Sequence, residues 1–416
     1  MRGPENEDLT TAGGGFNTER LVLRPLDRSD LPVHAHWLND FGTLRTTGAL
    51  PAPRTIDDLS DDYTRNLAPR QDAALFSVVE RQSGESIGWA FLVDIDRRHR
   101  SAKLVLGIGP PSARGKGFGT EATGGLLAYA FKNLGLRSVW LLVYAFNQAG
   151  IRAYAKAGFH DIGRRRAAHL LNGRWWDTIY MEVCRESAAH ARALATRRMH
   201  TRADRTWGVN PVMSSGDTLD TSPILNIVGE KVALGPPNRE QLPAYARWFS
   251  DLDTMRSQGS PEPGPRTVDE LGKWYDTEMS GNPARTWFSV YEQPSLRHIG
   301  FVELNHIDHR HRTATMSLMV GEPDARGRGY GTEMARLILD YGFTAVGLHN
   351  IMLEVYAFNE AGQRAYRKAG FSDFARRTQA YYADGQWWDI ILMEALSTEF
   401  ESPLLAKVFA PDEVRP

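Results

Sequence analysis

Hydrophobic and polar residues follow each other in runs that predict a mixed order of strands and helices. Alternating or β-branched and aromatic runs predict strands at 20–26, 74–80, 87–94, 103–108 and 139–144. Helical spacing predicts helices at 31–39, 120–134 and 148–157. A closing hairpin is expected with strands at 169–171 and 175–183, because Asn172-Gly173 favours a two-residue turn. This order is typical of an α/β domain.

The whole pattern occurs twice. Residues 113–182 align without a gap on residues 325–394, with about half of the positions identical, and Trp37 near the first start matches Trp248. A repeat of this size predicts a tandem duplication of one mixed-sheet domain with flanking helices, not a solenoid. The predicted boundaries are 16–185 and 224–397 for the domains, 186–223 for a linker of low hydrophobicity and 398–416 for a tail.

Composition narrows the classes of partner. The chain of 416 residues carries 49 basic and 50 acidic side chains, so no summed field favours nucleic acid or an anionic membrane. The single cysteine, Cys184, has no partner for a disulfide and no neighbours spaced for a zinc site. No stretch approaches the ~18 apolar residues of a membrane span. We therefore expect a cytoplasmic protein without nucleic-acid or membrane partners.

A glycine-rich loop lies between a predicted strand and a predicted helix in each copy. One reads Arg114-Gly115-Lys116-Gly117-Phe118-Gly119-Thr120, and the other reads Arg326-Gly327-Arg328-Gly329-Tyr330-Gly331-Thr332. Glycines let backbone N–H groups approach an anion, the helix start adds partial positive charge, and Arg or Lys adds a charged contact. The loops therefore favour a pyrophosphate, and they lack the signatures of NAD and ATP sites. A single loop of this kind could be only a tight connection between a strand and a helix. Two such loops, each followed by the same second motif, favour binding of a pyrophosphate.

A second motif follows each loop at the same distance. Residues 147–159 read NQAGIRAYAKAGF, and residues 359–371 read NEAGQRAYRKAGF. With the closing Gly-x-Trp-x-Asp hairpin, both copies resemble the GCN5-related N-acetyltransferase (GNAT) superfamily. More narrowly, they resemble its branch of ribosomal-protein N-terminal acetyltransferases and spermidine acetyltransferases. The resemblance covers nearly all of both predicted domains, and three motifs recur in the same order.

The resemblance implies an N-acyltransferase that uses acetyl-coenzyme A, or another acyl-coenzyme A, as co-substrate and needs no metal. It implies that residues 114–119 and 326–331 bind the pyrophosphate and that Thr120 and Thr332 also belong to the coenzyme-binding residues. The pantetheine arm would be held by the strands ending near Ile108 and Val320 and by Asn147 and Asn359. As implied general acids, Tyr154 and Tyr366 would protonate the departing thiolate, because a phenol stays protonated at neutral pH.

The acceptor is less constrained. A primary amine of a small molecule is the expected acceptor, and a protein N-terminus or lysine is an alternative. A third reading is an acyl-coenzyme A-binding regulatory protein with one inactive domain. Because single-domain relatives often pair, the chain is expected to be a monomer that acts as a covalent pseudo-dimer, or a homodimer.

Two positions depart from the family pattern. Related enzymes often place a glutamate base on the strand before the loop, where this chain has Lys103 and Thr315. In the second copy Glu303 and His306 are candidate substitutes. Lys103 would repel a cationic amine at short range, which argues against a polyamine acceptor in the first copy.

Two further motifs have structural interpretations. Trp175-Trp176-Asp177 and Trp387-Trp388-Asp389 are interpreted as core aromatics with an aspartate that fixes the turn. The basic segments 95–100 and 307–312 are interpreted as solvated hairpins, because His99 and His311 lack the partners of a metal site.

Overall fold

The computed structural model describes residues 15–40, 43, 55–62, 72–185, 223–256, 258, 264–279 and 282–408. The predicted linker, apart from residue 223, and the tail beyond residue 408 lie outside these ranges. Residues 15–185 form unit one, and residues 223–408 form unit two.

Unit one consists of strands flanked by helices. Its strands are β1 (Phe16–Asn17), β2 (Leu21–Pro25), β3 (Ala74–Glu80), β4 (Ser86–Asp96), β5 (Ser101–Ile108), β6 (Ser138–Tyr144), β7 (His160–Leu171) and β8 (Arg174–Cys184). Its helices are α1 (Leu31–Leu38), α3 (Ile56–Asp62), α4 (Phe118–Ala128) and α5 (Gln148–Lys156), and α4 continues as a π-helical turn at Tyr129–Asn133.

Unit two repeats this order. Its strands are β9 (Ile227–Val228), β10 (Val232–Gly235), β11 (Thr286–Glu292), β12 (Arg297–Asp308), β13 (Thr313–Val320), β14 (Asn350–Tyr356), β15 (Ser372–Ala383) and β16 (Gln386–Leu396). Its helices are α7 (Leu242–Ser250), α8 (Leu252–Arg256), α9 (Val268–Trp274), α10 (Tyr330–Asp340), α11 (Glu360–Ala369) and α12 (Leu405–Val408). The predicted α/β fold class and its tandem duplication are confirmed.

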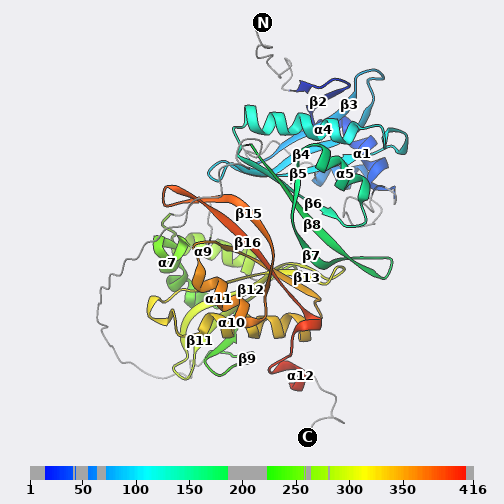
Figure 1. The fold of residues 1–416 in the computed structure, drawn as a ribbon. Coiled ribbons are helices and arrows are strands. Elements are labelled where there is room, and N and C mark those ends of the chain that lie inside the picture. The colour runs from blue at the N-terminus through cyan, green and yellow to red at the C-terminus, as the bar shows by residue number, and fades with distance from the viewer. Residues whose placement is uncertain are drawn as a thin grey trace, which may run out of the picture.

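The strands join in one sheet whose order is symmetric about its centre. The order of its 16 strands is β1-β2-β3-β4-β5-β6-β8-β7-β15-β16-β14-β13-β12-β11-β10-β9. At the centre β7 and β15 run antiparallel, with Gly163 opposite Ala375, its own counterpart in the repeat. A position that pairs with its counterpart lies on a pseudo-two-fold axis. Figure 1 shows the hairpins β7–β8 and β15–β16 crossing between the two units.

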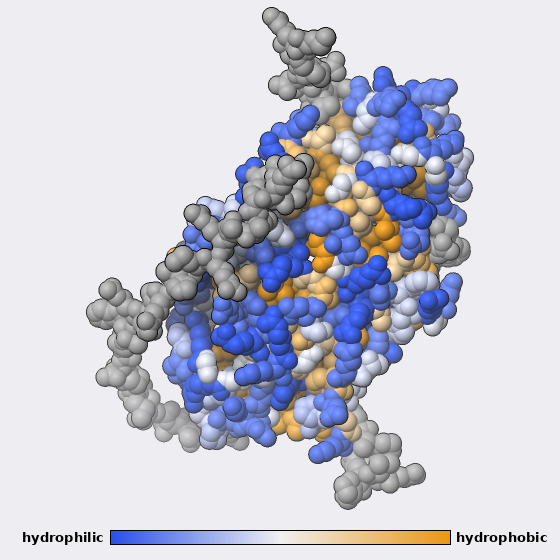
Figure 2. Space-filling view, viewed as in Figure 1, coloured by the Kyte–Doolittle hydropathy of each residue, from blue (hydrophilic) through white to orange (hydrophobic). Residues whose placement is uncertain are grey.

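Each unit has its own apolar core between the sheet and the helices that follow its glycine-rich loop. In unit one, Leu104 on β5 and Leu126 on α4 are almost completely buried in this core. In unit two, Met316 on β13 and Ile338 on α10 occupy the same layer. Figure 2 shows a face dominated by hydrophilic residues, with smaller hydrophobic patches over both units. Among the described residues, no helix is both long enough and apolar enough to cross a membrane.

Most predicted elements lie where the pattern placed them, and the Asn172-Gly173 turn is confirmed by positive φ at both residues. The last hairpin differs. Its first strand was predicted at 169–171 only, whereas β7 begins at His160. The extra strand contains three consecutive arginines, which an alternating pattern assigns to solvent. Here Arg166 donates to Glu394, and Arg165 donates to Asn350, both in unit two.

The interpretation of the basic segments as solvated hairpins is wrong for their histidines. His99 is 6% exposed, and its Nδ1 accepts the backbone N–H of Tyr382 in unit two at 2.8 Å. His311 is 8% exposed, and its Nδ1 accepts the N–H of Leu170 in unit one at 3.1 Å. The two hairpins therefore form reciprocal contacts between the units.

The Trp-Trp-Asp motifs also act elsewhere than predicted. Trp175 stacks on His349 of unit two, and Trp387 lies under the guanidinium of Arg137 in unit one, so both contact the opposite unit. Asp177 accepts the N–H of Ala167, a residue with φ of 45° in a bulge of β7, rather than fixing the turn.

Candidate active site

The two glycine-rich loops adopt the same anion-binding shape. Gly115 and Gly117 have φ of 74° and 85°, and Gly327 and Gly329 have 75° and 87°. Each second glycine is the N-cap of the following helix, whose first backbone N–H groups have no partner within the helix. A Cβ on Gly115 or Gly327 would meet no atom within 4 Å, so the loops stand open. This geometry fits a pyrophosphate.

The first arginine of each loop anchors the loop to the strand before it. Arg114 donates from Nε to the Ile108 carbonyl at 3.1 Å and from Nη2 to the Gly109 carbonyl at 2.6 Å. Arg326 donates to the Val320 carbonyl at 3.3 Å and pairs with Asp253 at 3.1 Å. These guanidinium groups therefore hold each loop against the strand before it.

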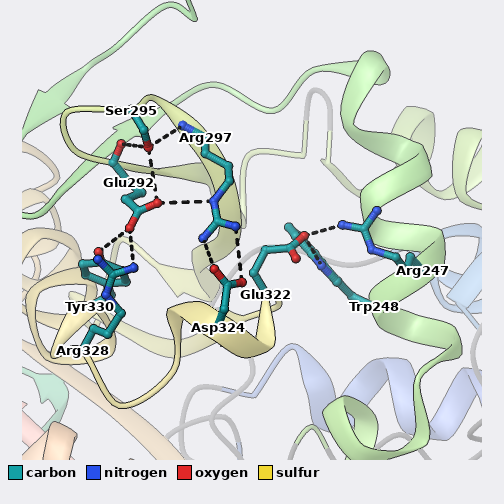
Figure 3. A network of polar contacts seen from close by, with 9 residues as sticks. All are labelled: Arg247, Trp248, Glu292, Ser295, Arg297, Glu322, Asp324, Arg328 and Tyr330. Atoms are coloured by element: carbon teal, nitrogen blue, oxygen red, sulfur yellow. Dashed lines mark hydrogen bonds and ion pairs between the residues drawn. The ribbon is translucent and has the colours of Figure 1, made fainter. Parts of the chain in front are cut away.

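The second basic residue of the loop differs between the two units. In unit two, Glu292 is 9% exposed and accepts from Arg328 at 2.7 Å and from the Tyr330 hydroxyl at 2.5 Å. This hydroxyl is the largest cause of the lowered pKa of Glu292. Figure 3 shows the network continuing through Arg297 to Asp324. In unit one the position of Tyr330 is Phe118, which has no hydroxyl to donate.

A cavity of about 910 Å³ lies below the first loop, and we call it cavity one. It opens because β5 pairs with β6 only at residues 101–103, beyond which the parallel strands separate. The edge of β5 from Leu104 to Ile108 lines it, as do Arg114 and Tyr154. Asp308 and His311 of unit two also line it, so both units form this cavity.

The equivalent cavity two, of about 1170 Å³, lies between β13 and β14. These strands pair only at residues 313–315 of β13, and residues 316–320 then line the cavity. Tyr366 and Asn359 line it, together with Leu142 and Tyr180 of unit one. Leu142 and Tyr180 also line cavity one, so the two cavities share part of a wall.

Both predicted general acids lie in these cavities. Tyr154 on α5 packs against Phe159, and Tyr366 on α11 packs against Phe371. Burial raises the pKa of Tyr154 and of Tyr366 to about 12. Each phenol therefore stays protonated at neutral pH and can donate its proton.

The predicted asparagines begin the helices that carry these tyrosines. The side-chain oxygen of Asn147 accepts the N–H of Gly150 at 3.0 Å, and that of Asn359 accepts the N–H of Gly362 at 2.9 Å. Neither amide nitrogen donates to a described residue, and both asparagines line their cavity. In the part of the chain that the structure describes, no three His, Cys, Asp or Glu side chains form a group that could hold a metal ion.

Comparison with known families decides the classification. The family model described as "Acetyltransferase (GNAT) domain" matches residues 20–160 and again residues 231–372. The chain belongs to the GNAT acetyltransferase family. It is an acyl-coenzyme A-dependent N-acetyltransferase with acetyl-coenzyme A as co-substrate, and its GNAT domain occurs twice.

Relatives of this GNAT protein match about one unit each. Spermidine N(1)-acetyltransferase of Escherichia coli K12 is 37% identical over 162 residues, which are 39% of this chain and 84% of that protein. The Vibrio cholerae spermidine N(1)-acetyltransferase is 29% identical over 134 residues, covering 32% and 76%. The solved structure of the Vibrio cholerae spermidine N-acetyltransferase with CoA and spermine is 28% identical, covers 40% of this chain and 96% of its own, and has a TM-score of 0.38.

In this GNAT chain, Lys103 and Thr315 occupy the positions where related enzymes often have a glutamate. Each is the last paired residue before its strand separates from the neighbouring strand. Lys103 lines both cavities, with its ammonium over the Trp140 ring at 5.5 Å, and Thr315 lines cavity two. Of the candidate substitutes, His306 lines cavity two. Glu303 is 7% exposed and pairs with Arg285 at 3.2 Å, which commits its carboxylate.

Two carboxylates of the GNAT cavities were not found in the sequence. Asp308 reaches cavity one from the other unit, and Glu354 lines cavity two from the middle of β14. Asp308 lies in the recurring segment 307–312, which was interpreted as a solvated hairpin, and Glu354 lies in no recurring motif, because its counterpart is Leu142. The sequence offered one signal for Glu354: a glutamate in one copy stands where the matching strand of the other copy has a leucine.

Proposed function

We propose that each unit transfers an acetyl group from its own bound acetyl-coenzyme A to a primary amine of a small molecule. The observation that carries the proposal is that both cavities join an open anion-binding loop to a protonated, buried tyrosine. The relatives named spermidine acetyltransferases support a small amine as the acceptor. One chain would then hold the two sites of a pseudo-dimer.

The proposed roles follow from the geometry of each cavity. Backbone N–H groups of the loop and helix start bind the pyrophosphate, and the free edge of β5 or β13 holds the pantetheine arm. Bound acetyl-coenzyme A supplies the thioester. The acceptor nitrogen forms a bond to the acetyl carbon as the carbon–sulfur bond breaks. Tyr154 or Tyr366 gives its phenolic proton to the departing sulfur, and the proton lost by the amine leaves through solvent in the open cavity.

Binding of acetyl-coenzyme A tests the loops. Gly119 and Gly331 lie in the first helical turn, where a side chain is not strained, and a Cβ at Gly331 would meet no atom within 4 Å. Gly119→Glu and Gly331→Glu therefore put bulk and negative charge into one loop each. By calorimetry the wild type should bind two equivalents and each variant one. Unchanged stoichiometry in either variant contradicts the proposed site.

Turnover tests the tyrosines, with one site blocked at a time. In the Gly331→Glu background, Tyr154→Phe should lower kcat by about 10²- to 10⁴-fold, because only the proton donor is lost. Coenzyme A release from acetyl-coenzyme A with butylamine measures the rate, and the Kd for acetyl-coenzyme A should not change. Tyr129→Phe is the matched control, since Tyr129 packs on Phe16 away from the cavity. A kcat within threefold of the background would exclude the general-acid role.

A further inference from the structure

Glu354 places an uncommitted carboxylate inside cavity two. Its neighbours on β14, Leu353 and Val355, are buried in the core of unit two at 1% and 3% exposure. Because side chains alternate along a strand, Glu354 points to the other face, where its side chain is exposed and lines the cavity that contains Tyr366. Its charge reaches Tyr180 and Tyr356, where it contributes to the raised pKa of both phenols.

Most of the other charged groups that line cavity two have partners. Asp253, the second carboxylate of the lining, pairs with Arg326, and Arg256 pairs with Asp384. Two cations enter from unit one. Arg165 donates to the side chain and carbonyl of Asn350 and to the carbonyl of Ala314, and Lys103 lies over the Trp140 ring.

Glu354 itself has no hydrogen bond or ion pair with any described residue. The remaining cations of the described lining, Arg364 and Lys368, lie on α11, and Arg364 pairs with Glu360 at 3.3 Å. A carboxylate that is open to solvent, has no partner among the described residues and lines the same cavity as a proposed proton donor is suited to bind a cation that enters from outside.

Cavity one differs at the equivalent position. There the strand residue is Leu142, which is 36% exposed and presents an apolar surface. Among the described residues, Asp308 is the one carboxylate in the lining of cavity one, and it accepts the backbone N–H of His311 at 2.8 Å. Burial lowers the pKa of Arg165 and of His169, and the nearby charge of Asp308 opposes this shift in both.

We propose that Glu354 binds the ammonium group of a cationic amine acceptor in unit two, and that unit one accepts a less cationic amine at Leu142. The inference rests on the proposed transfer to amines and adds the class of acceptor for each site. A chain with two sites would then acetylate two different amines.

Binding of a simple diamine tests Glu354 without requiring turnover. In the Gly119→Glu background with coenzyme A bound, 1,4-diaminobutane is titrated by calorimetry. Glu354→Gln keeps the size of the side chain and removes its charge, and it should weaken diamine binding by about 10- to 100-fold, the value of a charge-assisted hydrogen bond. The Kd for coenzyme A should not change. Diamine affinity within twofold of the parent, or no diamine binding by the parent, overturns the inference.

The reciprocal change supplies a gain of function. In the Gly331→Glu background, Leu142→Glu should create diamine binding in cavity one, and Leu142→Gln is the matched neutral control. Equal affinities in these two variants also contradict the inference. Coenzyme A release with an uncharged-tail amine such as butylamine separates the two proposals. If butylamine turnover persists while Glu354→Gln has no effect on diamine binding, only the inference fails; if no amine releases coenzyme A, the proposed function fails.

Discussion

At the scale of single residues, Glu292 distinguishes the two coenzyme A loops. Its carboxylate holds Arg328 and Tyr330, whereas Lys116, the counterpart of Arg328, has an exposed side chain that can turn to a phosphate. We predict that unit two binds coenzyme A more weakly than unit one. Glu292→Gln should strengthen binding by about 3- to 10-fold, because it removes a negative charge beside the pyrophosphate and releases a guanidinium. Calorimetry in the Gly119→Glu background measures this change.

Glu80 provides the control for that prediction. It occupies the position of Glu292 in unit one but accepts from Ser83, with a donor–acceptor distance of 2.9 Å. Glu80→Gln in the Gly331→Glu background should leave coenzyme A affinity unchanged. If Glu292→Gln weakens binding instead, the network serves to hold the loop in its binding shape.

A functional residue could be recognised from the sequence when its role depends on residues close to it in the chain. The loop glycines were recognisable because positive φ is a local requirement, and Tyr154 and Tyr366 because they recur at one distance from the loops. Glu354 was not recognisable, because its importance depends on the separation of two strands distant in the sequence. The positions of Lys103 and Thr315 were anticipated, but the partners around them were not.

At the scale of elements, the contact between β7 and β15 depends on the absence of a side chain at Gly163. A Cβ there would lie 2.0 Å from the carbonyl oxygen of Phe374 and 2.5 Å from the Cβ of Ala375. Gly163→Ala should therefore force the two strands apart and lower the free energy of unfolding by about 1–3 kcal/mol. Urea unfolding followed by tryptophan fluorescence measures the change.

Gly124→Ala is the matched control, since it makes the same chemical change at an open position in α4. Alanine favours a helix over glycine by up to about 1 kcal/mol, so this variant should be as stable as the wild type or more stable. Equal stability of Gly163→Ala and the wild type would mean that the central strands adjust without cost.

The elements themselves were largely predictable, because apolar positions recur with the period of each strand and helix. The length of β7 was not, because Arg164, Arg165 and Arg166 interrupt the alternation. Arg165 and Arg166 are stabilised here by acceptors in the other unit, and no pattern within one copy contains those acceptors. The short helix α3 was also missed, since its acidic composition lacks an apolar stripe.

At the scale of the whole molecule, the duplication could be predicted but the single sheet could not. Sequence similarity between the two halves indicates that they have the same fold. It does not indicate how the two halves pack against each other. The units share an apolar cluster in which Tyr180 of unit one packs with Met352 of unit two. They are also joined by reciprocal polar contacts: Glu182 accepts the N–H of Thr378 at 3.2 Å, and Glu394 accepts the N–H of Arg166 at 2.9 Å. Within one copy such residues look solvent-exposed.

The histidines of this interface make the stability of the pair dependent on pH. His99 and His311 each accept a backbone N–H from the other unit, which a protonated Nδ1 cannot do. Burial lowers the pKa of His99 and His311, and it lowers that of His169 to about 4. Between about pH 6.5 and pH 4 the unfolded chain therefore binds more protons than the folded one, so stability falls as the pH is lowered through this window.

The thermal unfolding midpoint, measured from pH 7.5 to pH 4.5, should decrease mainly below pH 6.5. A His99→Gln, His311→Gln double variant should have a lower midpoint than the wild type at pH 7.5. Its midpoint should fall less as the pH is lowered, because an amide oxygen accepts the same N–H groups without titrating. His160→Gln is the control, since His160 is exposed at the start of β7. In this variant the unfolding midpoint should change with pH as it does in the wild type. Equal slopes for the double variant and the wild type would show that the acid sensitivity arises outside these reciprocal contacts.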